Sequence, residues 1–195
     1  MNITQQPNLK PYRDIDPHEV VNLYAHVDAS ANKGSLVTIT EAEGNTNVWQ
    51  NANSPATPHL DVFGPLANTP SRAYANRYEV TWKVKNAISG DRPLGLTLYD
   101  VRELNAYGEK LIHRPRHERF ENDYVVSGEA VPVLVRGFVK INGFNGTPGP
   151  NSGAVPSASQ SGFVDVTNNP TAVNNVGKFL STPDADGYAH FKLEL

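Results

Sequence analysis

The chain has 195 residues, of which 19% are charged, and its formal net charge is −3. This balance gives no overall electrostatic reason to bind nucleic acid or an anionic membrane, because both need a basic surface. The absence of cysteine excludes disulfides and thiolate metal sites.

Glycine and proline each occur 15 times. A strand-and-loop protein uses these residues and asparagine at its turns, whereas a helical protein uses alanine, glutamate, lysine and leucine in their place. The composition therefore predicts an all-β fold.

Residues 1–17 hold three prolines and no alternating apolar pattern, so we expect an extended N-terminal arm before a β-rich domain formed by residues 18–195. The arm carries Leu9, Tyr12 and Ile15, which are candidates for contacts with a partner. They would act as a strand added to the partner's sheet or lie in a groove on it. If so, deleting the arm weakens binding and leaves the core folded.

Short strands are expected at 20–27 and 35–41, each bounded by turn residues. Residues 44–76 then form a long loop with four prolines and few charges. This loop keeps aromatic and aliphatic side chains, which a disordered segment lacks, so we expect it to pack on something. Trp49 and Phe63 are its candidate anchors on a neighbouring subunit or partner; alternatively, both cap the protein's own barrel.

The sequence RYEVTWKVKNA has an unbroken period of two, which predicts a half-buried strand at 77–85 with Trp82 in the core. A further strand is expected at 94–104. The basic stretch that follows contains Arg114, Arg116 and Arg119, which either form a solvated, charged edge or dock on an acidic partner surface.

The sequence SGEAVPVLVRGFVKING predicts one strand over residues 127–143, with a bulge or bend at Gly137. The uncharged stretch 143–162 is expected to be a second long loop. Weaker strands are expected at 162–167 and 177–180. One face of the predicted 127–143 strand carries Val131, Val133, Val135, Val139 and Ile141.

The last strand is predicted by the C-terminal alternation, and the sequence DADG before it predicts a turn. Seven or eight short strands in one domain predict a barrel or a sandwich. The apolar face of the last strand carries Ala189, Phe191, Leu193 and Leu195.

The motifs of catalysis and metal binding are missing from the sequence. It has no nucleophile elbow and no phosphate loop. His113 and His117 have a spacing of four, but a proline between them opposes the helix that a zinc site would need. Asp100, Glu103 and Glu109 are typical of solvated acids on an amphipathic strand rather than of a carboxylate pair for glycoside hydrolysis. We therefore predict a non-enzymatic protein with no catalytic residue, cofactor or metal.

Two blocks of the C-terminal half carry a family resemblance. The first is LGLTLYDVRELNAYGEKLIHRPRHERFENDYVVSGEAVPVLVRGFVKINGF, and the second is VGKFLSTPDADGYAHFKLEL. Both resemble head decoration proteins of tailed bacteriophages, also called capsid cement or stabilising proteins. The resemblance covers about the C-terminal half of the chain.

The resemblance implies a structural virion protein that binds the outside of an assembled icosahedral shell in many copies. Its partners would be the major capsid protein and further copies of itself, with a trimer favoured, and neither nucleic acid nor a membrane. The N-terminus shows no secretion signal, so we expect synthesis in the cytoplasm of a host bacterium before incorporation at the capsid exterior. The family has no catalytic residues to transfer to this chain.

Two other classes share the same features. A tail, neck or baseplate component would have the same β-rich, cysteine-free composition but would be present in few copies. A host-surface module that binds carbohydrate would use exposed aromatic residues such as Tyr12, Trp49 and Tyr74.

Overall fold

The computed structural model describes residues 6–11, 14–28, 30–40, 83–105, 107–109, 111, 123–168 and 174–195, and the backbone of 53–54 and 57–58. Within these ranges the regular structure is almost entirely β, which confirms the predicted class. The exception is a short 3-10 helix, η1 (Pro17–Glu19). No helix in this part of the chain has the length and apolar character of a membrane span.

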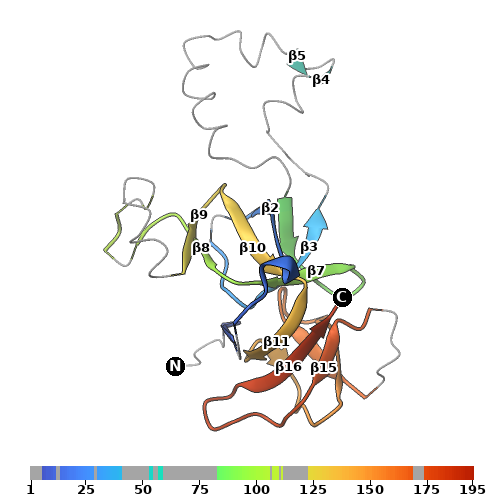
Figure 1. Cartoon of the computed structure of the whole chain (residues 1–195). Coiled ribbons are helices and arrows are strands. Elements are labelled where there is room, and N and C mark those ends of the chain that lie inside the picture. Colours follow the sequence, from blue (N-terminus) through green and yellow to red (C-terminus); the bar gives the residue numbers. More distant parts are fainter. Residues whose placement is uncertain are drawn as a thin grey trace.

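Five strands close into a small barrel in the middle of the molecule (Figure 1). Around the ring the order is β10-β2-β6-β3-β7, and all neighbours are antiparallel except β2 and β6. Apolar side chains that are completely buried, including Val37, Val84 and Val133, form a core cluster of these strands. The barrel strands are β2 (Val20–His26), β3 (Leu36–Thr40), β6 (Lys83–Asn86), β7 (Pro93–Thr97) and β10 (Ala130–Leu134).

A seven-stranded sheet lies below the barrel in Figure 1, with the order β1-β11-β16-β15-β13-β14-β12. Its long central strands bury every second residue, as a sheet with one solvated face does. The sheet strands are β1 (Leu9–Pro11), β11 (Arg136–Ile141), β12 (Phe144–Asn145), β13 (Gly153–Pro156), β14 (Val164–Thr167), β15 (Gly177–Phe179) and β16 (Ala189–Glu194).

A second hydrophobic cluster, which we call the shared core, contains residues of both the barrel and the sheet. Leu36 and Leu96 from the barrel belong to the same cluster of buried residues as Phe179 and Phe191 from the sheet. The ring centroids of the two phenylalanines are 5.0 Å apart, and Phe144 packs edge-on against Phe179 at 5.4 Å. Because this shared core contains residues of both units, the barrel and the sheet form one body. Two short pairs complete the described strands: parallel β8 (Asp100–Arg102) and β9 (Tyr124–Val126), and β4 (Asn53–Ser54) with β5 (Thr57–Pro58).

The prediction of one bent strand over residues 127–143 is wrong. The stretch forms β10 and β11, which belong to different sheets, and the chain passes from the barrel to the sheet at Val135. The Val135 N–H donates to the Glu19 carbonyl at 2.9 Å, one residue beyond the last β10–β2 pair. Gly137 lies just inside β11 with φ 147°, so the irregularity predicted there belongs to the start of a new strand.

Residues 143–162 differ from the predicted loop in that they contain β12 and β13. The Asn145 amide donates to the Ser157 hydroxyl and to the Asp165 carboxylate, both at 2.9 Å. Burial raises the pKa of Asp165, but the hydrogen bonds from Asn145, Ala158 and Ser157 outweigh it and hold that pKa below its usual range. This uncharged stretch is therefore ordered by long-range polar contacts.

The C-terminal strand has the predicted face, with Ala189, Phe191 and Leu193 buried, but Leu195 is 47% exposed because β16 ends at Glu194. The turn predicted by the sequence DADG is confirmed. The Asp184 carboxylate accepts the backbone N–H groups of Asp186 and Tyr188, and the Gly187 N–H closes the turn on the Asp184 carbonyl.

His26 is a buried titratable group at the end of β2, with 2% of its surface exposed. Its Nδ1 accepts the Asp28 N–H at 3.0 Å, so Nε2 carries the proton and donates to the Asn86 side chain at 3.2 Å. Burial lowers the pKa of His26, and the contacts with Asn86 and Asp28 oppose that shift only in part. The imidazole is therefore neutral in the folded protein near pH 7.

Acidification is expected to destabilise the wild type more than His26→Gln. The unfolded chain binds a proton at this histidine near pH 6.5, before the folded state does, so stability falls as the pH drops below about 6.5. Urea unfolding between about pH 7.5 and about pH 5 measures the difference, because the variant keeps the exposed His18 and the other histidines. Parallel stability profiles for the two proteins would show that His26 does not contribute.

Candidate binding groove

The N-terminal segment lies along the body of the protein. Leu9 pairs with Ile141 in β11, and its side chain is 2% exposed within the shared core. Two glycines let the segment approach closely. A Cβ on Gly34, which has φ 80°, would lie 2.6 Å from the Asn8 backbone, and one on Gly143 would lie 2.8 Å from Pro7.

In this placement the outer edge of β1 offers few backbone groups for adding a strand to another protein. The Asn142 N–H donates to the Asn8 carbonyl, so the alternation of an antiparallel pair turns the Leu9 N–H and Pro11 outward. The Leu9 N–H is satisfied by the Asn8 side chain at 2.8 Å, and proline has no N–H. Deleting residues 1–17 would also remove Leu9 from the core, so the core could not stay intact.

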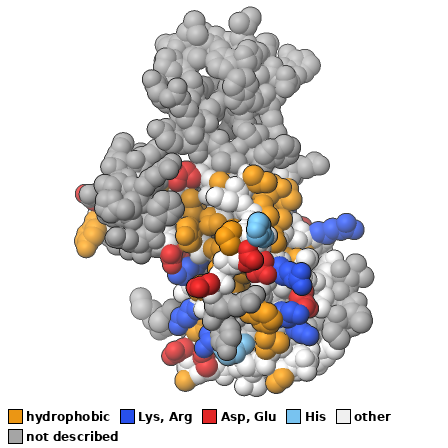
Figure 2. Space-filling view, in the orientation of Figure 1, with side chains coloured by type: hydrophobic (Ala, Val, Ile, Leu, Met, Phe, Trp, Pro, Cys, Tyr) orange, Lys and Arg blue, Asp and Glu red, His pale blue; other side chains and the backbone are white. Residues whose placement is uncertain are grey.

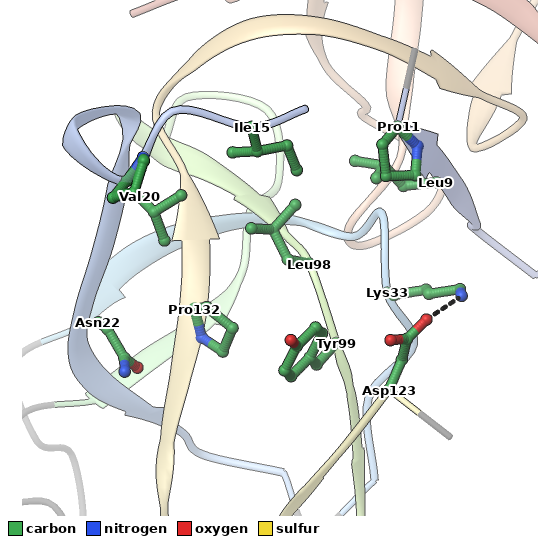
Figure 3. A pocket seen from close by; sticks show the side chains of 11 residues that line it. Leu9, Pro11, Ile15, Val20, Asn22, Lys33, Leu98, Tyr99, Asp123 and Pro132 are labelled. Atoms are coloured by element: carbon green, nitrogen blue, oxygen red, sulfur yellow. Dashed lines mark hydrogen bonds and ion pairs between the residues drawn. The ribbon is translucent and has the colours of Figure 1, made fainter. Parts of the chain in front are cut away.

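An apolar groove of about 570 Å³ lies beside this segment, where it passes over the barrel (Figure 3). In Figure 3, Ile15 and Leu98 approach each other across the upper part of the groove, with Pro132 and Tyr99 below them. Ile15, Val20 and Leu98 are half-buried and pack on the shared core. The groove is lined by Leu9, Pro11, Ile15, Pro17, Val20, Asn22, Lys33, Leu98, Tyr99, Asp123 and Pro132.

One end of the groove is charged and rigidly held. Lys33 Nζ lies 3.1 Å from the Asp123 carboxylate, and the Lys33 N–H donates to Asp100 at 2.7 Å. Arg102 holds the loop that contains Lys33, because its guanidinium donates to the Ala31 carbonyl at 2.7 Å. The same guanidinium lies 3.4 Å from the Asp100 carboxylate. The groove thus combines a long apolar wall with an ion pair at one end.

Such a groove is suited to contact with apolar groups. Its floor and walls are aliphatic, proline and tyrosine side chains, which gain free energy by leaving water. No group of three or more His, Asp or Glu side chains that could hold a metal ion occurs among the described residues.

Two of the predicted contact residues line this groove, namely Leu9 and Ile15. Leu9 is a buried part of the floor, and Ile15 is the more accessible of the two. The other predicted contacts lie outside the described residues. They are Tyr12, Trp49, Phe63, Arg114, Arg116 and Arg119.

Sequence reasoning missed Leu98, Tyr99 and Pro132. The strand expected at 94–104 divides into β7 and β8, and the bend between them brings Leu98 and Tyr99 to the groove. Pro132 could have indicated this site from the sequence, because a proline inside a regular alternation indicates an irregularity in the strand pairing. The register of β10 against β2 shifts at this position, and the Pro132 carbonyl accepts the Leu98 N–H at 2.9 Å.

Two comparisons with known proteins found no relative. No protein-family model matches the sequence, and no curated protein is found to be similar to it. The resemblance to phage decoration proteins therefore stays a prediction from the residues.

Proposed function

We propose that this protein is a non-enzymatic structural virion protein that binds the outer surface of an assembled phage capsid and stabilises it. The observation that carries the proposal is the resemblance of residues 94–144 and 176–195 to head decoration proteins. The described parts of these blocks contribute β7 and β10 to the barrel, β11, β15 and β16 to the seven-stranded sheet, and the β8–β9 pair. The same resemblance makes a trimer the expected oligomeric state.

Decoration of this kind stabilises a shell by mass action. A protein that binds the assembled shell but not its separated subunits adds its binding free energy to the assembly, summed over all copies. A β body whose barrel and sheet share a close-packed cluster transmits such contacts with little compression. The groove beside Ile15 and Leu98 is the surface on which we expect an apolar segment of the shell protein to lie.

The direct test uses shells from particles made without this protein, to which the purified protein is added. We expect saturable binding to the outer surface and a higher temperature of shell disruption. Absence of binding to intact shells, with the added protein shown to be folded, would contradict the proposed function.

Leu98→Asn is expected to weaken binding to shells about tenfold or more, because it places an amide in the centre of the apolar groove. The matched control is Leu23→Asn on β2, where the leucine is 64% exposed and does not line the groove. Binding isotherms of the three proteins give the comparison, and thermal unfolding checks that each is folded. If Leu98→Asn unfolds, Ile15→Asn takes its place. Wild-type affinity in a folded groove variant would exclude the groove as a contact.

A further inference from the structure

The solvated face of the seven-stranded sheet is rich in cations, and the strand register shows how they are arranged. The side chains on this face alternate with the buried ones in β11, β15 and β16. Figure 2 shows lysine and arginine side chains over the lower half of the molecule, where these strands lie in Figure 1, with aspartate and glutamate side chains among them. We call this surface the basic face, and its cations are Lys10, Arg136, Lys140, Lys178 and Lys192.

Two pairs of these cations stand directly opposite each other on neighbouring strands. Lys10 of β1 faces Lys140 of β11, and Lys178 of β15 faces Lys192 of β16. Like charges in directly opposite positions destabilise a sheet. The arrangement therefore costs stability in the isolated protein, which is expected where the charges serve a contact with another molecule.

Local contacts offset this repulsion only in part. Lys10 lies over the Tyr188 ring at 4.0 Å, and Lys140 lies 3.7 Å from the Asp184 carboxylate. Lys192 forms an ion pair with Glu194. The carboxylates of Asp184 and Glu194 thus form ion pairs with two of the five cations. These five cations are half of the lysine and arginine side chains in the described ranges.

The pKa values of both carboxylates are lowered, and the nearby cations contribute to this shift. The Lys192 hydrogen bond, together with the charges of Lys192, Lys178 and Arg136, holds the pKa of Glu194 below its usual range. Backbone hydrogen bonds lower the pKa of Asp184 first, and the charges of Lys140 and Lys10 add to that effect. The five cations thus outnumber these two carboxylates, in a chain whose net charge is −3.

We infer that the basic face is an electrostatic docking surface for an acidic patch on the outside of the capsid shell. The inference rests on the proposed function and adds the chemistry of the contact. A protein partner fits better than a nucleic acid, because Phe138, which lies opposite Lys192, gives the face an apolar component typical of protein interfaces.

The test compares two double variants with the same net charge. Lys140→Gln with Lys178→Gln removes one cation from each facing pair, whereas Lys85→Gln with Arg92→Gln removes two cations from the barrel side. Each is added to shells made without this protein, at about 50 mM and about 300 mM salt. We expect the basic-face variant to bind about tenfold more weakly at low salt and to lose most of its salt dependence. The control should stay within about twofold of wild type.

The basic-face variant should unfold at the same temperature as the wild type or higher, because it relieves repulsion between facing lysines. Equal binding of a folded basic-face variant and the wild type would overturn the inference and leave the proposed function standing. If the wild type itself fails to bind shells, both the proposed function and this inference are overturned.

Discussion

Leu193→Ala is expected to lower the free energy of unfolding by about 3 kcal/mol, within the range of about 2–5 kcal/mol for buried leucines. Leu193 is completely buried in the core shared by the barrel and the sheet. Its partners across β11 and β15 are Gly137 and Gly177, which have no side chains to move into the space. Urea unfolding at neutral pH measures the loss.

The matched control is Leu195→Ala, two residues further along the same predicted face. Leu195 is 47% exposed and lies beyond the last residue of β16, so the change should be within about 0.5 kcal/mol. Equal losses of unfolding free energy for the two variants would contradict a core that includes Leu193 and excludes Leu195.

Gly95→Ala is expected to cost about 3 kcal/mol or more, or to prevent folding, because it opposes closure of the barrel. Leu96, the next residue of β7, pairs with Leu134 of β10 and closes the ring. A Cβ on Gly95 would lie 2.1 Å from the Leu134 carbonyl oxygen, a backbone atom that cannot move without breaking the ladder. Thermal unfolding followed by circular dichroism reports the effect.

Gly149→Ala controls for the general effect of replacing glycine. A Cβ at this position would meet only the Ser152 hydroxyl, at the ordinary contact distance of 3.7 Å. The variant should therefore be as stable as the wild type or more stable by up to about 1 kcal/mol. A Gly95→Ala protein with wild-type stability would contradict the closed ring.

The period-two pattern predicted much of the β structure. Phe191 and Leu193 are buried where the C-terminal alternation placed them, and the strands expected at 20–27 and 35–41 are β2 and β3. Alternation succeeds because successive side chains of a strand point to opposite faces.

The same pattern could not show that residues 127–143 belong to two sheets. Val131 in the barrel and Val139 in the open sheet are both buried, and both fall on the odd-numbered positions of the alternation. The connection at Val135 between the two strands does not shift this alternation. Parity identifies the buried side of a strand but not the sheet that covers it. Only the long-range pairing of β10 with β2 and of β11 with β16 distinguishes the two.

The groove and the order in residues 143–162 were equally inaccessible to local reasoning. Leu9, Leu98 and Pro132 meet across distant parts of the chain, and Asn145 reaches Asp165 across 20 residues. The basic face arises in the same way, because Lys10 and Lys140 are facing neighbours only through the sheet register. Such contacts follow from topology, which a single sequence does not display.

The most direct test of the proposed decoration role is the copy number of this protein relative to the major shell protein. Quantitative mass spectrometry of purified particles from its source measures that ratio. Our account predicts a ratio close to stoichiometric with the shell subunits. A few copies per particle would contradict it and favour a tail or neck component, and absence from the particles would contradict it outright.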